Sequence, residues 1–156
     1  MRRADREVTD ACEIAGIMSR CEVLRIAINT DTVPYLLPVN FGMEPDGMTL
    51  YIHGAMDGTK YGLITRDNRV SFEMDCVHGL LPDEKAHNCS IDYESVIGWG
   101  YIDELTAEDD KRHALERIMT QYHSENFSFD NRAISFTRLL RLRVEARTGK
   151  RQKKMP

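Results

Sequence analysis

Short runs of alternating apolar and polar residues dominate this chain and predict a protein built mostly of β-strands. The stretch 23–29, "VLRIAIN", places Leu24, Ile26 and Ile28 on one face, as a half-buried strand does. The stretch 35–43, "YLLPVNFGM", alternates in the same way after the punctuation "TDTVP". We therefore expect the two stretches to form an antiparallel hairpin.

Four further strands are predicted along the chain. The turn signal "EPDG" at 44–47 leads directly into 48–53, and alternation recurs over 68–75, 93–105 and within 132–150. In the last of these, Leu140, Leu142, Val144 and Ala146 alternate with Arg141, Arg143, Glu145 and Arg147. The stretch 76–92 is polar and rich in turn residues, which predicts a long surface loop.

Helical periodicity appears in three segments. The stretch 9–20 begins with Thr9 as the expected cap, and 58–66 predicts a short helix with Tyr61 and Ile64 facing inward. The stretch 106–122 begins with Thr106 as the expected cap and has Asp109 at the capping-box position.

About six strands joined by short turns, with three helices, predict a mainly β fold, namely a compact antiparallel β-barrel with peripheral helices. A length of 156 residues fits one domain. We assign residues 1–148 to that domain and 149–156, "GKRQKKMP", to a solvated basic C-terminal tail.

Charge and composition narrow the function classes. The net charge of −4 argues against a general nucleic-acid binder, and no apolar run approaches the roughly 20 residues that span a membrane. The charged N-terminal residues have no apolar stretch behind them, so we expect a cytoplasmic protein. Four unevenly spaced cysteines fit reduced thiols in that compartment.

The stretch 50–64, "LYIHGAMDGTKYGLI", carries the first candidate chemistry. Gly58, Thr59 and Lys60 place backbone N–H groups, a hydroxyl and an ammonium at a predicted helix start, a combination that suits a phosphate dianion. A simple helix cap followed by an exposed lysine explains the same residues.

His53 ends the strand just before this segment, on the same face as Tyr51. A core histidine bonded to a backbone carbonyl is one explanation. The other is an imidazole that faces a bound ligand and donates a hydrogen bond or a proton, since its pKa lies near neutrality.

A mirrored pair of motifs, "CVH" and "HNC", supplies the second candidate. Cys76, His78, His87 and Cys89 have the ligand types of a tetrahedral zinc site. A Cys-x-His pair on an extended strand reaches one ion only if the backbone bends. We therefore favour surface thiols and solvated histidines, and expect no metal site.

Several stretches in their order resemble a known family: "MRRADREV", "PYLLPVNFGM", "LYIHGAMDGTKYGLI", "VSFEMD", "ESVIGWGYI" and "RLRVEARTGK". Over nearly the whole chain they resemble the pyridoxamine 5′-phosphate oxidase-like, FMN-binding split-barrel proteins, and among these the nitroimidazole-resistance (Nim) branch. The resemblance implies a six-stranded antiparallel barrel and a homodimer that holds FMN in clefts between its subunits.

The resemblance also implies site residues. Pro38, Val39, Asn40 and Phe41 would run along the flavin ring, His53, Gly54 and Ala55 would line the cleft, and Lys60 would hold the FMN phosphate. Ser95 and Val96 would close over the ring from the other side. Together with Gly58 and Thr59, these residues form the expected cofactor site, with His53 as the expected catalytic residue.

The implied reaction is the reduction of a nitroaromatic group, such as a 5-nitroimidazole, by electrons carried on FMN. Two other classes stay open: a flavin- or haem-binding protein without defined turnover, and a zinc-bearing regulatory or structural barrel. Pyridoxamine phosphate oxidation is less favoured, because the chain ends in "RTGKRQKKMP" and lacks the "R-L-x-P"-type ending of the biosynthetic enzymes.

Overall fold

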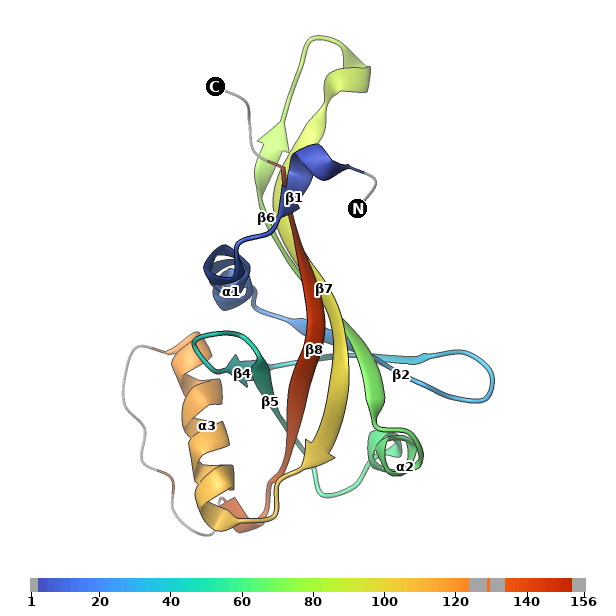
Figure 1. The fold of residues 1–156 in the computed structure, drawn as a ribbon, viewed down its shortest axis with the longest axis vertical. Helices are drawn as coiled ribbons and strands as arrows, with labels where there is room; N and C mark the ends of the chain where they lie inside the picture. The colour runs from blue at the N-terminus through green and yellow to red at the C-terminus, as the bar shows by residue number, and fades with distance from the viewer. Residues whose placement is uncertain (1–2, 124–128, 130–133, 153–156) are drawn as a thin grey trace.

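Antiparallel strands are the largest part of the computed structural model, which describes residues 3–123, 129 and 134–152 (Figure 1). Eight strands are found in these residues: β1 Glu7–Val8, β2 Leu24–Ile28, β3 Tyr35–Val39, β4 Phe41–Met43, β5 Thr49–Gly54, β6 Arg69–Leu81, β7 Ser90–Glu104 and β8 Arg138–Gln152. The helices are α1 Ala11–Arg20, α2 Thr59–Arg66 and α3 Glu108–Tyr122, with 3₁₀ turns at Ala4–Arg6 and Ala86–Asn88. The predicted mainly β class is confirmed.

One curled sheet carries the fold, in the order β3-β2-β6-β7-β8-β5-β4, and β1 pairs with β8. The stretch 35–43 was predicted as one strand, but it divides at Asn40 into β3, which pairs with β2, and β4, which pairs with β5. A single piece of chain thus links the two ends of the sheet order, which is how a split barrel closes. Counting β3 and β4 together, and leaving out the short β1, gives the predicted six barrel strands.

The predicted inward faces form the main hydrophobic core. Leu24, Ile26 and Ile28 of β2 are buried against the inward residues of β5 to β8 and against α1. A second, smaller cluster fills the space between α3 and the other face of β5 and β8, around Tyr51 and Ala114.

The alternation of β8 changes phase near its middle. The pairing of β7 with β8 shifts between Trp99 and Gly100, which leaves Glu145 as an extra residue of β8. Leu140, Leu142 and Val144 are buried as predicted, but Ala146 is exposed, because a bulge reverses the faces that follow it. Arg147 turns inward instead, and its guanidinium donates to the carbonyl of Asp46 at 2.7 Å.

The predicted loop 76–92 is mostly strand. β6 continues to Leu81 and β7 begins at Ser90, so the two strands form a long hairpin with the short 3₁₀ turn Ala86–Asn88 at its end. Figure 1 shows this hairpin projecting at the top, beyond the rest of the sheet. The loop prediction failed because this arm has no continuous apolar face to reveal its alternation.

The helices lie where they were predicted, but two caps differ. Asp10, rather than Thr9, caps α1, because its carboxylate accepts the Glu13 amide at 2.8 Å. Thr106 does not cap α3, whose N-cap is Ala107 without a side-chain bond; three acidic residues in the first turn complement the helix dipole instead. α2 buries Tyr61 and Ile64 as predicted.

The expected basic tail begins inside the sheet. β8 runs to Gln152, and Gly149 and Lys150 pair with Val8 and Glu7 of β1. Of the expected tail, only 153–156 lie outside the described residues. Among the described residues, no helix is both long enough and apolar enough to cross a membrane.

Candidate functional site

The junction between β5 and α2 brings four predicted site residues together. β5 ends at Gly54, the chain passes through Ala55, and α2 begins after Gly58 and presents Lys60 in its first turn. Gly58 has a φ of 157°, a conformation that side-chain-bearing residues rarely adopt. The predicted grouping of Gly54, Ala55, Gly58 and Lys60 is therefore present in the structure.

Gly54 makes this junction possible because it lacks a side chain. A Cβ placed there would lie 2.5 Å from Tyr61 Oη and 2.8 Å from Lys60 Nζ, so any larger residue would displace both groups. Tyr61 Oη donates a 2.6 Å hydrogen bond to the carbonyl of Ala55. Burial raises the pKa of Tyr61, which keeps this hydroxyl protonated and able to donate.

Lys60 is available to bind an anion. Among the described residues its ammonium forms no ion pair, and it lies 4.5 Å from the centre of the Tyr61 ring. The N-terminus of α2 has no side-chain cap, so the amides of its first turn have no side-chain acceptor. An unpaired cation beside uncapped helix amides is an arrangement that suits a phosphate group.

Arg138 is a residue of this junction that sequence reasoning missed. It pairs with Gly54 in the sheet, and its guanidinium stacks 3.6 Å from the centre of the Tyr61 ring. It also donates to the carbonyl of Met56 at 3.2 Å and forms an ion pair with Glu104. No local signal marked it, because it lies 84 positions beyond Gly54 in the printed sequence.

His53 is exposed, as a ligand-facing residue would be. Its neighbour across the sheet is Leu139 of β8, and among the described residues its imidazole has no side-chain partner. The core-histidine explanation is therefore wrong. The side chain is free to contact a small molecule bound beside Gly54.

The predicted segment Pro38–Phe41 spans the break between β3 and β4. Pro38 and Asn40 are exposed and Val39 is half-buried, but Phe41 is fully buried against the ring of Tyr122. The Phe41 amide is bonded to the Tyr122 hydroxyl at 3.0 Å. Phe41 therefore has no side-chain surface to offer a cofactor.

Ser95 and Val96 lie far from Lys60 in the same chain. Ser95 pairs with Lys150 of β8, whereas Gly54 pairs with Arg138, which is twelve residues away along that strand. At about 3.3 Å per residue, this separation is roughly 40 Å. The side chain of Val96 is also fully buried, so only Ser95 is partly open.

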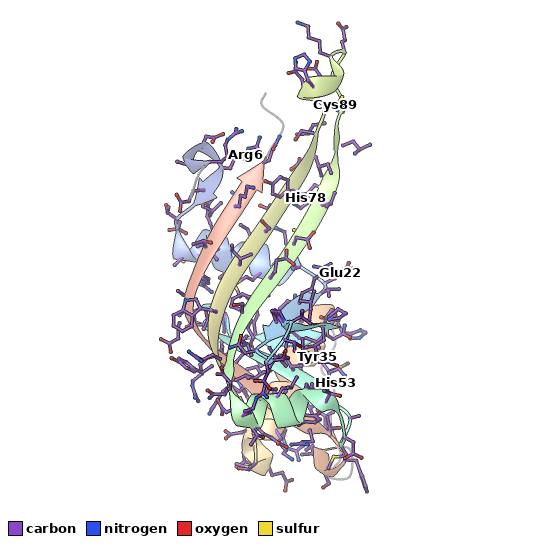
Figure 2. The ribbon with its side chains drawn as sticks, turned by 90° about the vertical axis from the view of Figure 1, so that its right-hand side faces the viewer. Arg6, Glu22, Tyr35, His53, His78 and Cys89 are labelled. Carbon is purple, nitrogen blue, oxygen red and sulfur yellow. The ribbon has the colours of Figure 1, made fainter. Side chains whose placement is uncertain are left out.

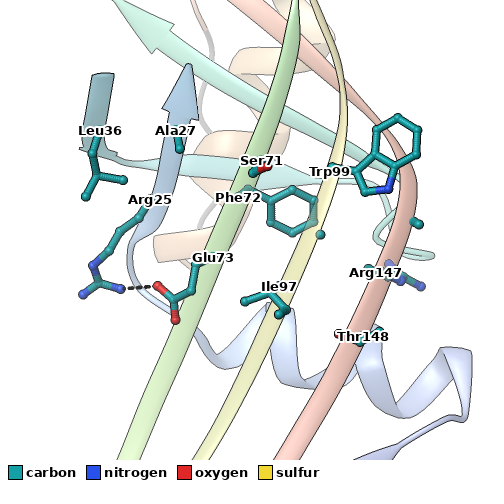
Figure 3. A pocket seen from close by; sticks show the side chains of 12 residues that line it. Arg25, Ala27, Leu36, Ser71, Phe72, Glu73, Ile97, Trp99, Arg147 and Thr148 are labelled. Atoms are coloured by element: carbon teal, nitrogen blue, oxygen red, sulfur yellow. Dashed lines mark hydrogen bonds and ion pairs between the residues drawn. The ribbon is translucent and has the colours of Figure 1, made fainter. Parts of the chain in front are cut away.

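An apolar cavity of about 630 Å³ opens on the outer face of the sheet, across β3, β2, β6, β7 and β8 (Figure 3). Trp99, Ile97 and Leu36 line it with exposed apolar surface, and Phe72 forms its floor. Arg25, which is paired with Glu73 at 3.1 Å, lies at its edge. The cavity has the apolar lining of a small-molecule or protein contact surface.

The four residues of the candidate zinc set lie in two separate places. Cys89 and His87 lie at the tip of the β6–β7 hairpin, and Figure 2 shows Cys89 well beyond His78 along this arm. Cys76 and His78 meet Glu94 of β7 instead, with ligand atoms within 4.8 Å of one another. The four candidate residues therefore do not form one site.

Solved structures of known proteins share this fold. A proposed 5-nitroimidazole antibiotic resistance protein from Bacteroides thetaiotaomicron is 29% identical, with a TM-score of 0.81 over 92% of this chain and 85% of its own. A flavocytochrome from Azotobacter vinelandii is 18% identical, with a TM-score of 0.83 over 100% of this chain and 73% of its own. An FAD- and haem-binding protein from Mycobacterium smegmatis is 18% identical, with a TM-score of 0.82 over 97% of this chain and 75% of its own.

Sequence comparison agrees with the fold. No curated protein matches the chain. The sequence pattern of the family described as pyridoxamine 5′-phosphate oxidase matches residues 10–151, which is nearly the whole chain. Together with the split barrel, this match establishes that the chain belongs to the pyridoxamine 5′-phosphate oxidase family.

Proposed function

We propose that this protein binds FMN and uses it to reduce nitroaromatic compounds such as 5-nitroimidazoles. The observation that carries the proposal is the unpaired Lys60 beside the uncapped start of α2, in a chain of the pyridoxamine 5′-phosphate oxidase family. The Bacteroides relative supports the substrate class.

The junction residues fit the phosphate of FMN. Lys60 supplies an ammonium, the amides at the start of α2 supply donors, and the absence of a Cβ at Gly54 leaves the space in which Lys60 lies. Thr59, the first residue of α2, is exposed at the same place and carries a hydroxyl. Arg138 supports the junction by holding Tyr61 and the Met56 carbonyl.

A second copy of the chain completes the proposed site. Because Ser95 is roughly 40 Å from the phosphate junction along β8, both cannot contact one FMN molecule from the same chain. A homodimer brings Ser95 of one subunit to the junction of the other. The exposed side chains of Leu36, Ile97 and Trp99 provide an apolar face for this contact.

Bound FMN supplies the electrons of the proposed reaction. Reduction of a nitro group also consumes protons. His53, which directly precedes Gly54 in β5, is exposed next to the junction. We assign an imidazole nitrogen of His53 as the donor that hydrogen-bonds and protonates the nitro oxygen. The backbone pairing of His53 with Leu139 fixes the backbone of His53 beside Gly54 on β5.

A flavin- or haem-binding protein without nitroreductase turnover is the alternative. The flavocytochrome and the FAD- and haem-binding protein share the fold, although at 18% identity. Haem in the purified protein would give a Soret band, whereas FMN alone would not. The absorbance spectrum therefore separates the two cofactors before any assay of turnover.

Consumption of reduced nicotinamide in the presence of a 5-nitroimidazole tests the activity. The FMN-loaded protein is expected to turn over, and His53→Ala is expected to lose at least about tenfold in kcat while retaining FMN, because only the proton donor is removed. His87→Ala, at the tip of the hairpin, is the matched control and should retain full activity. Equal turnover in wild type and His53→Ala would contradict the role of His53.

A further inference from the structure

We propose that Cys76, His78 and Glu94 form a zinc site that leaves one coordination position open. The three side chains lie on the paired strands β6 and β7 and contribute a sulfur, an imidazole nitrogen and a carboxylate oxygen. These are the ligand types that Zn²⁺ takes in proteins. The site is separate from the β5–α2 junction, since Figure 2 shows His78 and His53 well apart along the molecule.

The spacing of the ligand atoms matches a tetrahedral ion. Cys76 Sγ lies 3.8 Å from His78 Nε2 and 3.9 Å from Glu94 Oε2, and His78 Nε2 lies 3.0 Å from Glu94 Oε2. Ligand atoms 2.0–2.3 Å from a zinc ion at tetrahedral angles are about 3.3–3.8 Å apart. The three atoms therefore need shifts of only a few tenths of an ångström to share one ion.

A bulge in β6 brings these side chains together. Cys76 pairs directly with Glu94 across the sheet, and the register between β6 and β7 shifts between Val77 and Gly79. His78 is the residue at that shift. Because a bulge re-aims the side chain it contains, His78 reaches the same carboxylate as Cys76. This is the backbone bend that a Cys-x-His pair on a strand requires.

Two arginines, Arg20 and Arg151, hold the carboxylate of Glu94 in place. Glu94 is the one buried charged residue among those that the structure describes, with its side chain 4% exposed. Arg151 binds its Oε1, and Arg20 donates to Oε2 at 2.9 Å. The side chain of Arg20 is 46% exposed and can move aside when an ion takes Oε2, while Arg151 keeps the carboxylate oriented.

The fourth position of the ion would face an open cavity. Cys76, His78 and Arg20 line a hollow of about 530 Å³, which Asp75 and Arg25 also border. Three protein ligands with one position open to solvent is the arrangement of zinc sites that bind water or a small ligand. Arg25 at the border of this hollow is already ion-paired with Asp75 at 2.6 Å, and Glu22 also lines it, so the lining carries charges of both signs.

Zinc titration of the reduced, full-length protein, in competition with a chromogenic chelator, tests the site. We expect one Zn²⁺ per chain, and at least tenfold weaker binding in His78→Ala and in Cys76→Ser. His78 is 40% exposed, so its variant keeps the fold even where Cys76→Ser does not. Cobalt in place of zinc should give a thiolate-to-metal charge-transfer band that Cys76→Ser removes.

His87→Ala with Cys89→Ser is the matched control, because it removes the same residue types from the tip of the same hairpin. This double variant should bind zinc as tightly as wild type. Three results would each overturn the proposal. They are a wild-type protein that binds no zinc, an unchanged zinc affinity in His78→Ala, and a loss of zinc binding in the tip variant alone.

Discussion

At the scale of single residues, Glu44 shows how one carboxylate joins three elements. It lies in the turn after β4 and accepts hydrogen bonds from Tyr51 Oη of β5 at 2.8 Å and from His113 Nε2 of α3 at 2.6 Å. Arg117 of α3 forms an ion pair with its other oxygen at 3.2 Å. Burial raises the pKa of Glu44, but the bonds from His113 and Tyr51 and the charge of Arg117 outweigh it and lower the pKa overall.

This lowered pKa predicts an acid-sensitive contact between α3 and the sheet. A carboxylate with a lower pKa in the folded protein stabilises the fold fully above its unfolded value, 4.5, and loses that contribution as the pH falls through the folded value. The free energy of unfolding should therefore fall below about pH 4.5. Glu44→Gln should reduce this slope, whereas Glu116→Gln, at an exposed position of α3, should not. Equal slopes in wild type and Glu44→Gln would exclude the contact.

At the scale of elements, the backbone of α3 packs directly on β4 through Gly42. A Cβ at Gly42 would lie 2.3 Å from the amide nitrogen of Ile118 and 2.4 Å from the carbonyl carbon of Arg117. Both are backbone atoms of a helix and cannot swing aside as a side chain can. The position of α3 on the sheet therefore depends on a glycine at residue 42.

Gly42→Ala should consequently push α3 away from β4. We expect a loss of at least about 2 kcal/mol in the free energy of unfolding, as for overpacked cores, measured by chemical denaturation. Gly62→Ala in α2 is the control, since an added Cβ there meets nothing within 4 Å and should stabilise the helix by roughly 0.5–1 kcal/mol. Equal free energies of unfolding for Gly42→Ala and wild type would show that the backbone of α3 does not pack closely on β4.

Most elements follow from local pattern, and the misses have physical causes. Alternation located β2, the turn signal before β5 located that strand, and helical spacing located α2 with Tyr61 inward. The division at Asn40 was not predictable, because alternation continues across it while the pairing partner changes from β2 to β5. Because Glu145 is an extra residue in β8, the side chains that follow it lie on the opposite faces from those predicted. Only the register of β8 against β7 reveals this extra residue.

The candidate site was predictable only in its contiguous part. Gly54, Ala55, Gly58 and Lys60 are neighbours in sequence, so one motif contains them. Arg138 and Glu94 reach their partners through strand pairing across many positions, which no local pattern reports. The local sequence also does not show that the side chains of Phe41 and Val96 are buried in the core.

At the scale of the whole molecule, the long strands β6, β7 and β8 separate the phosphate junction from Ser95. The proposed dimer follows from that separation and from the exposed Trp99 and Ile97, which are 44% and 55% exposed. A charge placed at their centre would be buried without a partner if a second copy covers this face.

Sedimentation equilibrium should therefore show a dimer for the wild type and at least tenfold weaker association for Trp99→Lys. The variant should also bind FMN more weakly, because the proposed site needs both copies. Phe136→Lys provides the control, since Phe136 is 68% exposed and lies outside the cavity that Trp99 lines. A Trp99→Lys protein that remains fully dimeric would place the interface elsewhere.

The binding of FMN at the β5–α2 junction is the central claim. The most direct measurement is the absorbance spectrum of the protein after FMN is added and free ligand is removed by desalting, with a titration of wild type, Lys60→Ala and Lys85→Ala. We expect flavin bands in the wild type and in Lys85→Ala, which alters the hairpin arm, and a loss of about 1.5–3 kcal/mol in FMN affinity for Lys60→Ala. A wild-type protein that retains no flavin, or equal affinity in Lys60→Ala, would contradict the account.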